Sequence, residues 1–316
     1  MFYGEGEYCF EPVENWGIEA KEKWPDITEI AGISVDWEDN VYLLTRTQPP
    51  VIKMSPAGEI LEWFGEGVFV RPHGIFRDKD GTIYGVDDRA HAVYRFNDKR
   101  ELEYTFGTKG VPSDTGCPED GNYKCVTHGG APFNRPTRLV IDREGYIYIT
   151  DGYRNARVHK FKKAGTLVKS WGEPGEGPGQ FNLPHGIGID SKDRLYVADR
   201  QNHRVQIFTT EGEYLDEWHG FDRPSDIWVT EDDTIYVSDC KRTSVFNEYP
   251  SALSIFNTDG QLLCRIDQGG PNIEGGPHRC AHGMAVDSKG DLYIAEVGKI
   301  LPKDFYGVRK YRRVYK

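Results

Sequence analysis

Three histidines occur in one short phrase that recurs at matching places of a repeating chain. The three phrases are Arg71-Pro72-His73-Gly74-Ile75, Leu183-Pro184-His185-Gly186-Ile187 and Cys280-Ala281-His282-Gly283-Met284. Imidazole is a favoured ligand of zinc and related divalent metals, and three such ligands leave one coordination position for water or substrate. The sequence therefore predicts a catalytic metal site formed by His73, His185 and His282, provided that the fold brings the three phrases together.

The strands around these histidines form an internal repeat. Each unit has an apolar strand ending in Asp or Thr, a polar turn, and a second strand that contains Tyr. The first strands of the six units start at Ile33, Ile75, Leu139, Ile187, Ile227 and Met284. Alternating apolar and polar residues, aromatic residues and Asp-Gly turns indicate antiparallel strands, and no segment shows a convincing helical period. Four short strands in about 40 residues are typical of a β-propeller blade.

We therefore expect an all-β fold, a single six-bladed β-propeller domain over residues 1–316. The predicted blades cover about residues 30–65, 69–107, 133–172, 181–220, 221–268 and 278–314. The last unit has only three strands, and residues 7–13 have no local partner. We expect residues 7–13 to close the ring as the outer strand of the last blade, because this removes its weakest edge.

Six blades place every second blade about 120° apart around the axis. The histidine phrases open units two, four and six, so their side chains should converge at one mouth of the central channel. The alternative interpretation is that Pro-x-Gly-Ile only marks the start of a blade and carries histidine by chance. Strict alternation favours the metal site. Five other histidines are expected to be solvated residues of outer strands or turns, namely His91, His159, His203, His219 and His278.

Charge and composition limit the possible partners and compartment. A net charge of −11 argues against nucleic acid and against an acidic membrane surface, since both require a basic surface on the protein. No apolar window is long enough for a membrane span. The first residues carry acids where an export signal would be basic, so the sequence predicts a cytoplasmic protein with free thiols. Cys117 and Cys125 lie in an insertion that we interpret as a surface loop rather than a zinc knuckle.

Three more residues are candidates for the site because they break the repeat near the predicted mouth. Tyr153 and Arg200 belong to a repeated turn with Asp, Asn and Arg, which spans Asp151–Arg157 in unit three and Asp199–Arg204 in unit four. Arg46 holds the same place in unit one. Residues that vary at one rim of a repeated scaffold are better functional candidates than those that keep the repeat. The repeated Asp and Asn are interpreted as turn residues.

The stretch from Phe133 to Phe208 resembles an NHL-repeat propeller. Its motifs follow one another in the order found in the peptidyl-α-hydroxyglycine α-amidating lyases. These motifs are Thr150–Arg157, Trp171-Gly172, Pro178–Phe181, Pro184-His185 and Val197–Gln206. As repeats, the resemblance extends over nearly the whole chain. NHL repeats alone say little about activity, but the three alternating histidines and the Asp-Gly-Tyr phrase are more discriminating.

The resemblance implies that the three histidines hold zinc and that Tyr153 is the base. It implies a metal-dependent lyase, in which zinc lowers the pKa of the hydroxyl of a carbinolamide and the C–N bond breaks to an amide and an aldehyde. Arg46 or Arg200 would hold a carboxylate, because a guanidinium suits bidentate contact. The substrate would be a small molecule.

The chain departs from the family at several positions. The last ligand phrase of the family reads Met-Pro-His-Asp, and its Asp contributes to a structural calcium, so Gly283 puts that ion in doubt here. Asn134 and Arg154 stand where the family has disulfide-forming cysteines beside the Asp-Gly-Tyr loop. We therefore expect a stand-alone intracellular relative whose substrate need not be a peptide.

Two alternative functions stay open from the sequence. The same three-histidine site would serve a zinc-dependent hydrolase of a lactone, ester or amide. A non-catalytic NHL interaction propeller would bind no metal and would use the face of the ring.

Overall fold

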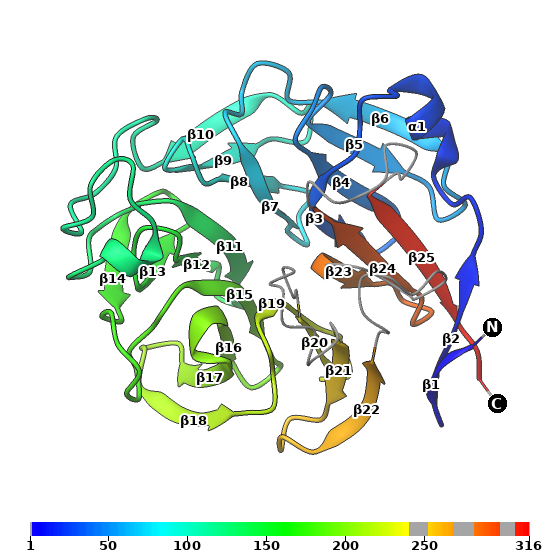
Figure 1. Ribbon diagram of the computed structural model, residues 1–316. Helices are drawn as coiled ribbons and strands as arrows, with labels where there is room; N and C mark the ends of the chain where they lie inside the picture. Colours follow the sequence, from blue (N-terminus) through cyan, green and yellow to red (C-terminus); the bar gives the residue numbers. More distant parts are fainter. Residues whose placement is uncertain (1, 240–251, 268–280, 298–306, 316) are drawn as a thin grey trace.

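The computed structural model describes residues 2–239, 252–267, 281–297 and 307–315, and its strands form six antiparallel sheets around a central axis (Figure 1). Five sheets have four strands, and the sheet that closes the ring has five. In each sheet the strand that opens the predicted repeat unit lies nearest the axis. This arrangement confirms the predicted all-β, six-bladed propeller.

The first three blades follow one another along the chain. They consist of β3 (Ile30–Val35), β4 (Val41–Thr45), β5 (Val51–Met54) and β6 (Ile60–Phe64); β7 (Pro72–Arg77), β8 (Ile83–Asp87), β9 (Ala92–Phe96) and β10 (Leu102–Phe106); and β11 (Pro136–Ile141), β12 (Tyr146–Asp151), β13 (Arg157–Lys162) and β14 (Leu167–Trp171). Blades four and five consist of β15 (Pro184–Ile189), β16 (Arg194–Asp199), β17 (Arg204–Thr209) and β18 (Tyr214–Trp218), and of β19 (Pro224–Val229), β20 (Ile235–Asp239), β21 (Ala252–Phe256) and β22 (Leu262–Asp267).

The sixth blade joins the two ends of the chain. Its strands are β23 (Ala281–Val286), β24 (Leu292–Glu296), β25 (Val308–Arg313), β2 (Tyr8–Val13) and β1 (Tyr3–Glu5). Strand β2 pairs antiparallel with β25, and the register places Phe10 opposite Arg313. The predicted clasp is thus confirmed, and β1 extends it by one further strand. The termini lie close together at this edge (Figure 1).

Helical segments are short, and the sequence did not predict them. Helix α1 (Ile18–Lys23) lies between the clasp and the first blade and buries Ala20. Two single 3₁₀ turns occupy Tyr123–Cys125 and Arg200–Asn202. A helix of six residues is too short to produce a detectable hydrophobic period, which is why pattern analysis missed it. None of the helices in the described ranges is long and apolar enough to cross a membrane.

The apolar core lies between neighbouring blades. Each blade contributes one fully buried tyrosine from its second strand: Tyr42, Tyr84, Tyr148, Tyr196, Tyr236 and Tyr293. In four blades the tyrosine hydroxyl donates to the Asp that follows the first strand, at 3.3 Å for Tyr42 and Asp36, 2.8 Å for Tyr148 and Asp142, 3.0 Å for Tyr196 and Asp190, and 3.0 Å for Tyr293 and Asp287. The repeated Asp and Tyr of the sequence are therefore a structural pair that holds the first hairpin against the next sheet.

The prediction that the remaining histidines are solvated is correct for His203 and His219 and wrong for two others. His159 is completely buried on β13, where Nδ1 contacts Ser170 Oγ at 2.7 Å and Nε2 lies 3.4 Å from a carboxylate oxygen of Asp151. His91 is also buried and accepts a hydrogen bond from the backbone of Arg135. Buried polar groups of the turns need such partners. His278 lies outside the described residues.

The clasp should contribute strongly to stability. Phe10 is 1% exposed and packs among residues of blades five and six. Phe10→Ala should lower the free energy of unfolding by about 3–5 kcal/mol, because it leaves a cavity beside the closing strand. Urea unfolding followed by circular dichroism measures the change. Leu61→Ala, at a side chain that is 51% exposed, is the control and should be nearly neutral. Equal shifts in the two variants would contradict the role of the clasp.

Candidate metal centre

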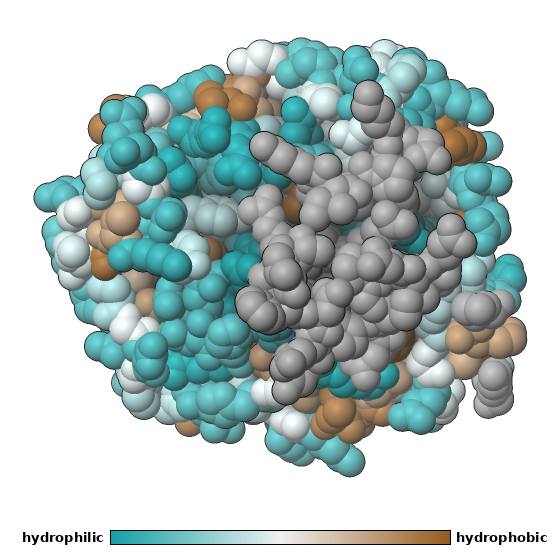
Figure 2. All heavy atoms as spheres, in the orientation of Figure 1, coloured by the Kyte–Doolittle hydropathy of each residue, from teal (hydrophilic) through white to brown (hydrophobic). Residues whose placement is uncertain are grey.

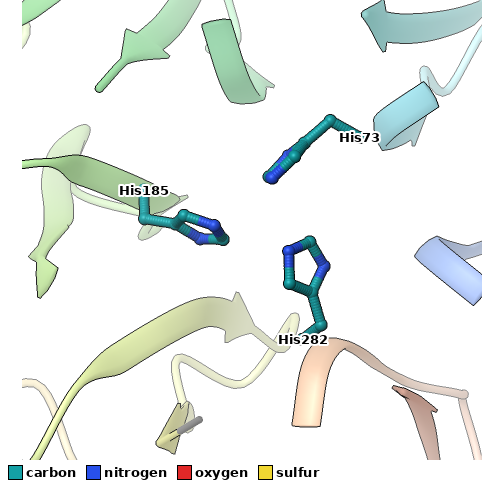
Figure 3. A group of neighbouring side chains, drawn as sticks. All are labelled: His73, His185 and His282. Atoms are coloured by element: carbon teal, nitrogen blue, oxygen red, sulfur yellow. The ribbon is translucent and has the colours of Figure 1, made fainter. Parts of the chain in front are cut away.

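The three predicted ligands occupy equivalent positions near the starts of innermost strands β7, β15 and β23. Beside each histidine the register with the second strand shifts, between Pro72 and Gly74, between Pro184 and Ile187, and between Ala281 and Gly283. A β-bulge leaves a residue out of the ladder and re-aims its side chain. The three imidazoles accordingly point toward the axis, where Figure 3 shows them facing one another.

The imidazoles of His73, His185 and His282 form one compact, buried cluster. Their ring centroids lie 4.9 Å apart for His73 and His185, 4.6 Å for His73 and His282, and 5.0 Å for His185 and His282. One nitrogen from each ring lies within 4.8 Å of the others. None of the three residues is more than 4% exposed. The structure therefore brings together all three predicted ligands in a geometry that could hold a metal ion.

A backbone carbonyl from the next blade orients each imidazole. The pairs are His73 Nδ1 with Thr137 O at 2.8 Å, His185 Nδ1 with Ser225 O at 2.5 Å, and His282 Nδ1 with Ala31 O at 2.7 Å. Because a carbonyl can only accept, Nδ1 carries the proton and Nε2 keeps its lone pair. Nε2 of His282 is buried without a hydrogen-bond partner. Such an arrangement of oriented, unprotonated nitrogens fits a divalent metal.

Glycine follows His73 and His185 because a larger residue would clash with the neighbouring strand. A Cβ on Gly74 would lie 2.6 Å from the carbonyl oxygen of Thr137, and one on Gly186 would lie 2.8 Å from that of Ser225. These are the same carbonyls that accept from His73 and His185. Glycine therefore allows the neighbouring strand to approach closely enough to orient the imidazole.

Electrostatics keeps the cluster neutral. Burial lowers the pKa of all three histidines well below the ordinary value, because a charged imidazole would lose its hydration. For His73, the neighbouring His282 and His185 lower the pKa further, and for His185 the next cause is the charge of Arg200. Neutral imidazole is the form that binds metal, so the site does not need to lose a proton at neutral pH before a metal binds.

Tyr153 and Arg200 lie directly beside the cluster. The Tyr153 hydroxyl is 3.1 Å from Nε2 of His73 and 3.2 Å from Nε2 of His185. Arg200 is 5% exposed, donates from Nη1 to the tyrosine oxygen at 3.5 Å, and has a buried Nε with no partner. The structure thus places Tyr153 at the Nε2 atoms that could bind a metal, and Arg200 next to Tyr153.

Arg46 lies near the cluster but is engaged elsewhere. Its Nη1 forms a 3.0 Å ion pair with Glu29, and its Nε donates to the carbonyl of Pro72 at 3.4 Å. Its charge still contributes, after burial and the neighbouring histidines, to the lowered pKa of His73 and His282. Glu29, which orients this guanidinium, was not identified from the sequence because it lies in a non-repeating segment.

The insertion between blades two and three holds the loop of Tyr153. The guanidinium of Arg154 donates to the carbonyls of Glu119 at 2.8 Å and Cys117 at 3.2 Å, and its backbone carbonyl accepts from Thr115 Oγ1 at 2.8 Å. Its backbone N–H donates to Asn134 O at 3.2 Å. The two positions where the family has cysteines are therefore joined by a hydrogen-bond network. The sequence predicted only a surface loop here, because it gives no sign of contacts made across the insertion.

Asp88, a residue at the same rim of the ring, was not identified from the sequence. Asp88 follows the second strand of blade two, the place that Arg46 and Arg200 hold in their blades. It is fully buried, pairs with Arg71 at 2.9 Å, and its pKa is raised to about 6 because burial outweighs the nearby arginines. The rule that selected Arg46 and Arg200, a residue that breaks the repeat at this rim, would have found it.

The residues of the innermost strands next to the histidines do not fit a structural calcium ion. Gly283 supplies no carboxylate. The guanidinium of Arg138, from innermost strand β11, instead pairs with Asp226 of β19 and donates to the carbonyl of Ile75. A carbonyl that accepts from a guanidinium and a carboxylate that is already paired do not form a calcium cage.

Comparisons with known proteins agree with this architecture. A protein-family model described as NHL repeat matches residues 181–208. The chain is 27% identical over 243 residues to rat peptidylglycine α-amidating monooxygenase. This alignment covers 66% of this chain and 24% of the rat protein. It is 31% identical over 160 residues to a probable peptidyl-α-hydroxyglycine α-amidating lyase of Caenorhabditis elegans, covering 49% of this chain and 42% of that protein. The chain therefore contains NHL repeats and resembles the amidating lyases, while it spans less than half the length of these two relatives.

Other proteins are similar in sequence or in structure and carry different names. Human NHL repeat-containing protein 3 is 28% identical over 274 residues, covering 76% of this chain and 70% of that protein. A streptogramin B lyase structure superposes with a TM-score of 0.60 at 14% identity, covering 98% of this chain and 97% of that one. A gluconolactonase from Xanthomonas campestris gives 0.60 at 15% identity, covering 91% and 87%. At these identities the solved structures show the propeller fold alone.

Metal analysis tests the candidate centre. Purified protein should contain about one zinc or similar divalent ion per chain if the three imidazoles form one site. His185→Ala removes one ligand and should remove most of the metal, as measured by plasma mass spectrometry. His219→Ala is the matched control, since that histidine is exposed on the outer edge of blade four. Full metal content in His185→Ala would refute the site.

Proposed function

We propose that this protein is a metal-dependent lyase that cleaves the C–N bond of a small α-hydroxy amide. The observation that carries the proposal is the position of the Tyr153 hydroxyl, 3.1 and 3.2 Å from the metal-facing nitrogens of His73 and His185. A phenol at this position can reach a proton on a substrate hydroxyl bound at the same point. The similarity to proteins named amidating lyases supports the same reaction class.

Zinc is the ion that we assign to His73, His185 and His282. Three imidazoles with one open position suit its tetrahedral preference, and neutral imidazole suits zinc better than calcium or magnesium. When bound, zinc would polarise the hydroxyl of the substrate as a Lewis acid. The protein contributes the outer carbonyls that fix the rings and the neutral environment that keeps them available.

In this proposal Tyr153 is the general base. As the phenolate, it accepts the proton of the carbinolamide hydroxyl. The positive charge of Arg200, whose Nη1 lies 3.5 Å from the phenol oxygen, stabilises the phenolate before the proton is transferred. As the carbonyl forms, the C–N bond breaks and its electron pair stays on nitrogen, which takes up the proton that Tyr153 accepted. The products are an amide and an aldehyde, and the equation balances without an oxidant or a second substrate.

Arg200 is the better of the two candidates for binding a substrate carboxylate. Its Nε is buried without a partner, whereas Arg46 already pairs with Glu29. A guanidinium with a free edge can hold a carboxylate in a bidentate contact. Figure 2 shows that hydrophilic side chains predominate on the viewed face over blades two to four, which also suits a polar substrate. We therefore infer an α-hydroxyglycine derivative with a small acyl group.

Tyr153→Phe separates the lyase from the alternatives. Removal of the hydroxyl should lower turnover of an N-acyl-α-hydroxyglycine by about 10²–10⁴-fold, because it removes the base and leaves the ring. Glyoxylate release measures the rate, and zinc content and melting temperature should stay unchanged. Tyr146→Phe, in the same blade but away from the cluster, is the control and should keep full activity.

The alternatives predict different results. Full activity of Tyr153→Phe toward a lactone, ester or amide would favour the zinc hydrolase and remove tyrosine from the mechanism. Wild-type protein that binds no metal and turns over none of these compounds would favour an interaction propeller.

A further inference from the structure

A buried ion pair crosses the channel beside the histidine cluster. Arg138 lies on β11 in blade three and Asp226 on β19 in blade five, 88 residues apart in the chain. Arg138 Nε donates to Asp226 Oδ1 at 2.8 Å, and Nη2 donates to Oδ2. The residues are 8% and 1% exposed. Blade four separates blades three and five, so the two side chains must meet on the side of β15 that faces the central axis.

The same pair is bonded to the strands of two histidines. Nη1 of Arg138 donates to the carbonyl of Ile75 at 3.4 Å, and the backbone N–H of Met284 donates to Asp226 Oδ2 at 2.9 Å. Ile75 lies two residues after His73 on β7, and Met284 lies two residues after His282 on β23. The ion pair therefore links four innermost strands.

The residue before each member of the pair orients a ligand. Thr137, before Arg138, accepts from His73 Nδ1, and Ser225, before Asp226, accepts from His185 Nδ1. Any shift of Arg138 or Asp226 along its strand would move one of these carbonyls. A displaced carbonyl would rotate the imidazole or leave its N–H unpaired, and outer partners of this kind tune metal affinity.

We propose that Arg138 and Asp226 are positioning residues for the metal centre and that the Arg138 guanidinium takes the place of a structural cation in the channel. The fork of Arg138 satisfies both oxygens of Asp226 and also reaches the carbonyl of Ile75, so these oxygens already have a cationic partner. Gly283, which brings no carboxylate, agrees with this arrangement. The inference rests on the proposed metal site but not on the lyase reaction.

Zinc affinity tests the positioning role. Arg138→Met should weaken zinc binding about 10–100-fold in a competition titration with a chromogenic chelator. Arg138→Lys should lie between Arg138→Met and the wild type, because an ammonium restores the charge but not the fork. Lys310→Met is the matched control, since it removes a similarly buried ion pair with Asp291 on the outer part of blade six. It should keep wild-type zinc affinity even where its melting temperature falls.

Asp226→Asn provides a second route if Arg138→Met does not fold. It keeps the size of the side chain and an oxygen for Met284, and it should also weaken zinc binding. Wild-type zinc affinity in a folded Arg138→Met or Asp226→Asn protein would overturn the positioning role alone. A wild-type protein with no zinc affinity would overturn the metal site as well, so the two failures are distinguishable.

Calcium tests the other half of the proposal. Calcium chloride added to metal-free wild-type protein should leave the melting temperature unchanged, because the guanidinium already occupies the channel. A rise in melting temperature with calcium alone would show that the ion is still bound and would overturn the substitution. Arg138→Ala combined with Gly283→Asp removes the guanidinium and adds a carboxylate, and this variant should become more stable when calcium is added.

Discussion

Three imidazoles share one buried volume, with ring centroids between 4.6 and 5.0 Å apart, so a proton on any Nε2 would face the other two rings without solvent. This constraint requires each ring to be neutral, with Nδ1 protonated and directed away from the other two rings. The fold meets it by giving every Nδ1 a backbone carbonyl from the following blade. That contact in turn requires a bulge beside each histidine and, in two blades, a glycine where the neighbouring strand comes close.

The number of blades decides whether this geometry is possible. Alternate blades of a six-membered ring supply the histidines, and the blades between them supply the carbonyls of Ala31, Thr137 and Ser225. Each apolar cluster joins neighbouring sheets, so the angle between blades is fixed by packing rather than by loops. The clasp formed by β2 is part of the same requirement, because an open ring would not hold the sixth blade, and His282 with it, at its distance from the others.

Residues that recur in the repeat and residues that differ between blades have different roles. The repeated Asp and Tyr support the hairpins, and the repeated Asp-Asn turn holds backbone amides. For example, Asp151 accepts from the side chain of Asn155 at 2.7 Å and from the backbone of Asn134 at 2.7 Å. The positions that differ between blades make individual contacts. Tyr153 contacts His73, His185 and Arg200, whereas Arg46 pairs with Glu29 and Asp88 pairs with Arg71. The candidate site residues other than the histidines are thus exceptions to a regular scaffold.

The blade count, the clasp and the three convergent histidines could be predicted from the sequence, because each follows from a local pattern repeated at a regular interval. Tyr153, Arg46 and Arg200 were also identifiable as exceptions to that pattern. The folded structure shows how they differ, since Tyr153 and Arg200 contact each other beside the histidines whereas Arg46 pairs with Glu29. Helix α1 was too short to show a period, and His159 was buried by a contact with Asp151 that its position on an outer strand did not suggest.

Contacts between residues far apart in the chain had no sequence signal. Arg138 and Asp226 are separated by 88 residues, and each looks like an ordinary charged residue after a small polar one. The contact of the insertion with Arg154 is similar, since nothing in its composition marks the carbonyls of Cys117 and Glu119 as acceptors. Periodicity reports which face of a strand is buried, but the partner of a buried charge depends on where the closed ring brings other strands. The sequence alone therefore predicts the three histidines of the candidate centre, and the closure of the ring sets the contacts that hold them in place.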